Sequence, residues 1–195
     1  MVLARPSPDF ANQPLAIERV EPATLVRVTR YPDTEPYFGK SAGNRFDDPL
    51  RGFGVCYAGQ DLLVAFAETI LHDALPFGGE YRVEEAKLAD RHVITFYGDP
   101  LNLANLTGAA LKRLGGTNEI SAEVPYNTPQ LWSRAVHEHP SNADGLLYVS
   151  RHVNTNLGFA LFERSRMKLR RAMKTPLLSH PDLAGVLDTL GVAVF

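Results

Sequence analysis

The chain has 195 residues, 45% of them hydrophobic, which is enough for one domain with a buried core. Its 20 basic and 22 acidic residues give a net charge of −2, which provides no overall attraction for nucleic acid or an anionic membrane. The single cysteine, Cys56, excludes an intrachain disulfide and fits a reducing compartment. The N-terminal stretch has no apolar signal segment, and no apolar run approaches the roughly 20 residues of a membrane span. We therefore expect a soluble, cytoplasmic protein without direct nucleic-acid or membrane partners.

The first quarter of the chain has little regular patterning. Residues 1–22 are rich in proline, which predicts an N-terminal arm. Alternation in residues 25–28 predicts a strand that carries Arg27. Residues 32–52 hold many Pro, Gly, Asp and Asn residues and predict one long loop, a kind of segment that often carries function.

The middle of the chain mixes strands and helices. Residues 54–58 predict a buried strand, and Asp61 is placed to cap a following helix in which apolar residues recur at helical spacing from Leu62 to Ile70. Further strands are expected near residues 92–97, 145–149 and 158–163. Further helices are expected near residues 100–114 and 129–137.

The C-terminal stretch has a clear helix signal. Pro181 suits a first helical position, an apolar stripe runs from Leu183 to Leu190, and Gly191 ends it. Strands and helices follow one another without regular alternation, which predicts a single compact α+β domain with mixed or antiparallel sheets and flanking helices. We expect an arm at 1–22, the domain at 23–175 and a C-terminal helical extension at 176–195.

Three stretches partly match known functional motifs, but each lacks a residue that the motif requires. The glycines of Gly52-Phe53-Gly54 precede a strand, and Tyr57 stands where a dinucleotide fingerprint has its third glycine. His137-Glu138-His139 has no second ligand cluster, so no metal site is expected. Ser150-Arg151-His152 lacks the elbow that exposes a serine nucleophile. The basic residues of 164–174 fit a solvated sheet edge, with contact to a partner or to nucleic acid as the alternative.

Four polar residues occupy predicted elements of the first third. Arg27 lies on a strand, Arg45 in the long loop, Tyr57 on a strand and Glu68 on a helix. Each residue has an ordinary structural explanation by itself, and spacing alone leaves the function open.

The order of these elements resembles the RES domain. The resemblance is carried by residues 44–49 (Asn-Arg-Phe-Asp-Asp-Pro), 54–58, 65–69 and 144–151, and spans roughly residues 24–163. It implies a fold similar to ADP-ribosyltransferase toxins and a toxin partnered by an antitoxin of the Xre helix-turn-helix type. It also implies NAD⁺ as substrate, with degradation by hydrolysis or phosphorolysis, or transfer of ADP-ribose to a protein. A non-catalytic interaction module is the alternative of another class, and a homodimer is left open.

The resemblance also assigns site residues. Catalytic roles fall to Arg27, Tyr57 and Glu68, with Arg30 replacing Arg27 if the alignment shifts. NAD⁺ binding falls to Arg45, Tyr31, Thr128 and Ser150. Guanidinium groups suit the pyrophosphate, a tyrosine face suits the cationic nicotinamide ring, and a carboxylate stabilises positive charge that develops on the ribose. Nicotinamide leaves readily, so neither a metal nor a resident cofactor is expected.

Overall fold

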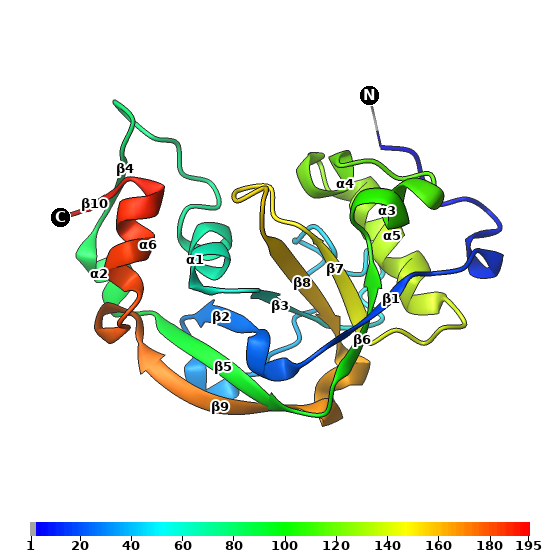
Figure 1. The fold of residues 1–195 in the computed structure, drawn as a ribbon, viewed down its shortest axis with the longest axis horizontal. Helices are drawn as coiled ribbons and strands as arrows, with labels where there is room; N and C mark the ends of the chain where they lie inside the picture. The colour runs from blue at the N-terminus through cyan, green and yellow to red at the C-terminus, as the bar shows by residue number, and fades with distance from the viewer. Residues whose placement is uncertain (1–2) are drawn as a thin grey trace.

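The computed structural model describes residues 3–195 and is built around one curled eight-stranded sheet (Figure 1). Its strands are β1 (Ile17–Val20), β2 (Val26–Thr29), β3 (Val55–Gly59), β5 (His92–Gly98), β6 (Leu101–Asn105), β7 (Gly145–Val149), β8 (Leu157–Phe162) and β9 (Leu169–Pro176). They lie in the order β1-β6-β7-β8-β3-β2-β5-β9, and all neighbours are antiparallel except β6 and β7. A two-stranded parallel sheet joins β4 (Tyr81–Val83) to β10 (Val192–Val194).

Within residues 3–195, six α-helices flank the sheet in two groups. They are α1 (Leu62–Ile70), α2 (Glu85–Ala89), α3 (Gly108–Arg113), α4 (Glu119–Ala122), α5 (Asn127–Glu138) and α6 (Leu183–Leu190). Figure 1 shows α1, α2 and α6 at one end of the curled sheet and α3, α4 and α5 at the other. In residues 3–195, no helix combines the length and apolar character required to span a bilayer.

The core divides between the two ends of the sheet. Phe66 and Ile70 of α1 pack with Val28 of β2 and Val186 of α6. At the other end, the fully buried Trp132 of α5 packs among apolar residues of the sheet and of the N-terminal segment. Helix α1 is therefore fixed against β2 along one side, and this packing determines where its polar residues lie.

Most of the predicted elements are present. The strands expected near 92–97, 145–149 and 158–163 correspond to β5, β7 and β8, and the helix expected near 129–137 is α5. Asp61 caps α1, because its Oδ1 accepts a hydrogen bond from the Val64 main-chain nitrogen at 2.8 Å. Helix α6 ends at Gly191, whose φ of 62° lies in the left-handed region that favours glycine. The predicted α+β class with a mixed sheet is confirmed.

Two expectations differ from the structure. The helix predicted for 100–114 is wrong over its first half, because residues 101–105 form β6 and only 108–113 are helical. In the segment 1–22, expected as an arm, residues 17–20 form the edge strand β1, which pairs with β6. Within the same segment, Phe10 is buried and its ring lies 5.6 Å from that of Trp132. Long-range pairing and packing thus order a segment that has weak local patterning.

The cap of α1 provides a stability test. We expect Asp61→Ala to lower the free energy of unfolding by about 1 kcal/mol or somewhat more, because Asp61 also accepts a hydrogen bond from Asn156 at 2.8 Å. Urea unfolding monitored by circular dichroism measures the change. The matched control is Asp99→Ala, which alters an exposed aspartate. Equal midpoints for the two variants would contradict the capping role.

Candidate functional site

A cavity of about 420 Å³ is lined by β2, β3, β7 and α1 and by the loops that precede β3 and α5. This volume lies within the range of small-molecule sites. Its polar lining includes Arg27, Arg45, Tyr57, Glu68, Tyr126 and Tyr148. The structure therefore brings together the four polar residues that the sequence spreads over strand, loop, strand and helix.

Arg27 lies where two neighbouring strands separate. Strands β2 and β3 pair only at Val26 and Gly59. Nη1 of Arg27 donates a hydrogen bond to the Tyr57 carbonyl at 2.7 Å, and its Nε donates to Oε1 of Glu35 at 2.8 Å. The Glu35 side chain is only 1% exposed, so the two charges form a largely buried pair. Arg27 is thus held rigidly and neutralised by its own partner.

Arg45 is buried without such a partner. Its Nη1 donates to the Glu123 carbonyl at 2.8 Å, and its guanidinium lies 4.5 Å from the centre of the Tyr126 ring. Its Nη2 is buried and has no hydrogen-bond partner within residues 3–195, and no carboxylate of that range lies within ion-pair distance. Burial lowers the pKa of Arg45. Arg45 thus brings to the cavity lining a positive charge that no carboxylate of residues 3–195 balances, which suits an anion such as a phosphate group.

Tyr57 is fixed by its hydroxyl group. Its Oη donates to Oδ1 of Asp47 at 3.0 Å and accepts a hydrogen bond from the Phe46 main-chain nitrogen at 2.9 Å. Burial, followed by the charge of Asp47, raises the pKa of Tyr57 well above its ordinary value, so it remains a neutral phenol. The ring is therefore the part of Tyr57 left to contact a ligand in the cavity.

Glu68 is held by a buried serine. Ser150 Oγ donates to Oε1 of Glu68 at 2.6 Å, and it accepts hydrogen bonds from the main-chain nitrogens of His152 and Val153, each at 3.2 Å. These two donors occupy the lone pairs of Ser150 and direct its hydrogen toward Glu68. Ser150 is not among the residues that line the cavity, so it orients the carboxylate from behind.

Comparison with known proteins identifies the family. A family model described as RES domain matches residues 23–181, which is most of the chain. The chain belongs to the RES domain family. A curated relative described as "Probable toxin y4kH", from Sinorhizobium fredii (strain NBRC 101917 / NGR234), is 31% identical over 96 residues. The match covers 49% of this chain and 75% of that relative.

A solved structure resembles this RES domain along most of its length. It is the crystal structure of the M. tuberculosis MbcT–MbcA toxin–antitoxin complex, and the match has a TM-score of 0.60 at 16% sequence identity. The match covers 82% of this chain and 88% of the solved chain. Identity at this level shows the fold alone, and it agrees with the fold that the RES resemblance implied.

Besides Ser150, two of the assigned residues are not part of the cavity lining. The Tyr31 side chain is 68% exposed and is not part of the lining. Thr128 lies in the first turn of α5 and is not part of the lining either, although Tyr126 two residues earlier is. Arg30, the alternative to Arg27, forms a surface ion pair with Asp90 at 2.8 Å. The geometry therefore favours Arg27 over Arg30 and gives no support to Tyr31 or Thr128 as ligand contacts.

Sequence reasoning missed four residues at this site: His72, Tyr126, Tyr148 and His152. His72 follows Glu68 by four residues, a spacing that places side chains on one helical face. Tyr148 precedes Ser150 by two residues, the repeat of a strand. These spacings were available signals. Tyr126 and His152 lie in irregular segments, and only the folded chain shows that they are near Glu68 and Arg45.

The triplet 137–139, considered as a metal site from the sequence, is occupied by structural contacts. The His137 ring stacks on Phe53 with 3.8 Å between ring centres. His139 Nε2 lies 3.0 Å from the Gln13 carbonyl. The two imidazoles therefore serve packing and hydrogen bonding at the end of α5.

The positive charge of Arg45 in the cavity lining generates a binding prediction. We expect inorganic pyrophosphate to raise the melting temperature of the protein, with about 2.7 kcal/mol of stabilisation at 100 times its dissociation constant. Arg45→Gln should remove this shift, because it removes a positive charge that no carboxylate of residues 3–195 balances. The control is Arg30→Gln, which removes a surface arginine paired with Asp90. An equal pyrophosphate shift in both variants would rule out Arg45 as the anion contact.

Proposed function

We propose that this RES domain is a toxin that consumes NAD⁺ by breaking the bond between nicotinamide and ribose. The observation that carries the proposal is one cavity lined by two groups: the guanidinium of Arg45, which has no carboxylate partner within residues 3–195, and the carboxylate of Glu68, which Ser150 holds. NAD⁺ has a pyrophosphate and a cationic ring attached to ribose, which are the chemical counterparts of these groups. NAD⁺ is the substrate in this proposal, and no resident cofactor takes part.

The reaction needs electrostatic stabilisation more than proton transfer. When the bond between C1′ of the ribose and N1 of nicotinamide breaks, its electron pair moves onto the ring and neutralises the ring's positive charge. Positive charge then develops on the ribose, and a fixed carboxylate stabilises it more than it stabilises the ground state. Glu68 supplies that carboxylate, and the hydrogen bond from Ser150 fixes its position before the reaction. The ring of Tyr57 offers a stacking surface for the nicotinamide.

The acceptor of ADP-ribose attacks the positively charged C1′ once nicotinamide has left. With water, the O–H proton is lost to solvent or to a neighbouring base, and free ADP-ribose results. With phosphate, one of its oxygens forms the new bond and ADP-ribose 1″-phosphate results. A protein nucleophile would instead become ADP-ribosylated. The three outcomes give different products from the same first step.

Glu68 is the first residue to substitute, because its carboxylate carries the proposed catalytic role. We expect Glu68→Gln to lower nicotinamide release by about 10² or more, because the charge is lost while an amide oxygen can still accept from Ser150. NAD⁺ affinity, measured by calorimetry, should change little, since the carboxylate acts mainly in the transition state. The control is Glu80→Gln at an exposed position. Undiminished turnover in Glu68→Gln would refute the assignment.

Chromatography of the same reactions, with and without phosphate and with labelled NAD⁺ in cell lysate, identifies the acceptor. Unchanged NAD⁺ under all of these conditions would favour a non-catalytic interaction module. The alternative outcomes are therefore separated in one set of assays.

We further propose that an antitoxin protein, of the Xre type, neutralises the toxin. The relative described as a probable toxin and the neighbour from a toxin–antitoxin complex support this partner. Expression of the chain alone should arrest bacterial growth, and co-expression of an antitoxin encoded beside it should restore growth. Glu68→Gln should be harmless without the antitoxin. Normal growth with the unmodified chain at full expression would contradict a toxin function.

A further inference from the structure

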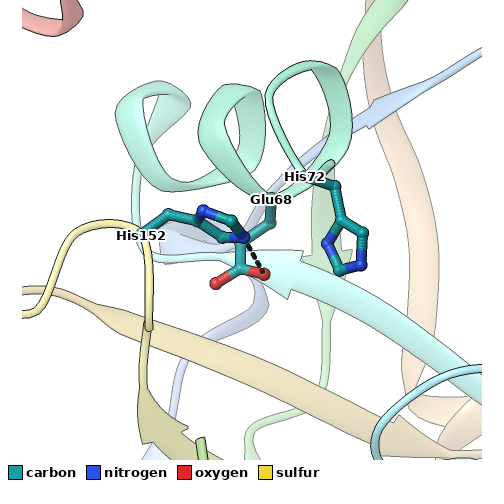
Figure 2. A group of neighbouring side chains, drawn as sticks. All are labelled: Glu68, His72 and His152. Atoms are coloured by element: carbon teal, nitrogen blue, oxygen red, sulfur yellow. Dashed lines mark ion pairs between the residues drawn. The ribbon is translucent and has the colours of Figure 1, made fainter. Parts of the chain in front are cut away.

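Two imidazole rings stand beside the Glu68 carboxylate, and the proposed reaction gives neither of them a role. His72 follows the end of α1, and His152 lies in the loop between β7 and β8. Figure 2 shows the carboxylate between the two rings. One ligand atom from each of Glu68, His72 and His152 lies within 4.8 Å of the other two.

The chemistry of this set matches a transition-metal cation. Two imidazole nitrogens and one carboxylate oxygen are the protein ligands of an open zinc site, whose fourth position is taken by water. Calcium and magnesium prefer ligand sets made of oxygen alone, so this set discriminates against them. Glu68 is suited to coordination because Ser150 binds its Oε1 and leaves Oε2 toward His152.

One pair of ligand atoms already lies near the spacing of a metal-bound site, and the third lies within 4.8 Å of both. Glu68 Oε2 and His152 Nε2 are 3.9 Å apart, whereas tetrahedral zinc holds its ligand atoms about 3.4 Å apart. A small contraction suffices for this pair. The His72 side chain is 37% exposed, which leaves its ring free to rotate toward the ion.

Two hydrogen bonds compete with coordination. Arg151 Nε donates to His152 Nε2 at 3.1 Å, and His72 Nε2 lies 3.2 Å from the Tyr126 hydroxyl. The site is partly open, so water can replace either contact when an ion takes the nitrogen lone pair. The positive charge of Arg151 weakens cation binding, so the ion is expected to bind reversibly.

We propose that Glu68, His72 and His152 form a reversible Zn²⁺ site and that a bound ion inhibits this enzyme. The inhibitory part rests on the proposed function. An ion on Oε2 would neutralise the charge that stabilises the ribose cation, and it would occupy space beside the cavity wall to which Glu68 and His72 contribute. Zinc is here an inhibitor and takes no part in the reaction.

Metal binding is tested without reference to activity. Tag-free protein is titrated with Co²⁺, whose visible absorption reports tetrahedral coordination, and Zn²⁺ is then added to displace it. We expect one equivalent of each ion to bind, and His72→Gln and His152→Gln each to weaken binding at least tenfold. The control, His180→Gln, changes a histidine outside the cluster and should bind as the parent does. Melting curves show that each variant is folded.

The result that overturns the site is absence of saturable binding, or equal binding by His72→Gln and His180→Gln. Inhibition is tested by adding zinc to the nicotinamide-release assay and then removing it with a chelator. Half-inhibition should occur near the dissociation constant found by titration, and His72→Gln should need at least tenfold more zinc. Turnover that is unaffected at saturating zinc overturns the inhibition. A protein that binds zinc but never cleaves NAD⁺ overturns the proposed function and the inhibition, while the metal site stands.

Discussion

The arrangement of the site depends on one constraint, which is that a buried charge must have a partner. Leaving one partner of a buried ion pair alone costs about 3–5 kcal/mol. The RES domain satisfies this requirement with three ion pairs that contain a buried carboxylate: Arg27 with Glu35, Arg134 with Asp48, and Lys168 with Asp144. Within residues 3–195, the buried guanidinium of Arg45 has only a carbonyl and an aromatic face. The fold therefore leaves a demand for negative charge at one place, and a ligand can meet it.

The strand split that positions Arg27 shows how main-chain geometry and site chemistry are linked. Because β2 and β3 pair only at Val26 and Gly59, the Tyr57 carbonyl takes its hydrogen bond from a side chain. Arg27 then connects β3 to Glu35 in the long loop. The loop that carries Arg45 is anchored in a similar way, since Asp47 accepts from the Tyr57 hydroxyl. The irregular loop 32–52 is thus held in place by hydrogen bonds that involve Arg27 of β2 and Tyr57 of β3.

Local signals predicted α1, β3 and α6 well, because capping residues and apolar spacing act within a few residues. They failed for 101–105, where Leu101 and Leu103 are buried and Asn102 is exposed in the alternation of a strand. This run is only five residues long and is soon followed by a helix. Its apolar residues therefore also fit the helical spacing of a longer helix, and the sequence does not separate the two. Its pairing with β1, more than 80 residues earlier, is a long-range contact that no local window contains.

The sequence indicated which residue types could take part in the site, but it did not show which residues of each type would meet there. Arg27, Arg45, Tyr57 and Glu68 line one cavity, and family resemblance was needed to select them from residues of the same kind. Tyr31, which the resemblance assigned to NAD⁺ binding, is 68% exposed and is not part of the cavity lining. The resemblance gave Ser150 a place at the ligand, whereas the structure shows the serine behind the carboxylate. The direction in which a side chain points depends on the packing around it, so matching positions in a family pattern does not show whether that side chain faces the ligand.

The same carboxylate of Glu68 that could stabilise a cationic reaction centre could also bind a metal ion, and the two uses conflict. In residues 3–195 its carboxylate has no Lys or Arg within ion-pair distance, so its charge remains available to the ribose cation of the proposed reaction and equally to a metal ion. The neighbouring charges of Arg45 and Arg151 oppose both, but Coulomb repulsion is twice as large for a divalent ion as for a monovalent one. In the proposed reaction, NAD⁺ would also bring a pyrophosphate that neutralises Arg45, which a bare metal ion does not. The arginines therefore favour a substrate that carries its own negative charge over a simple cation.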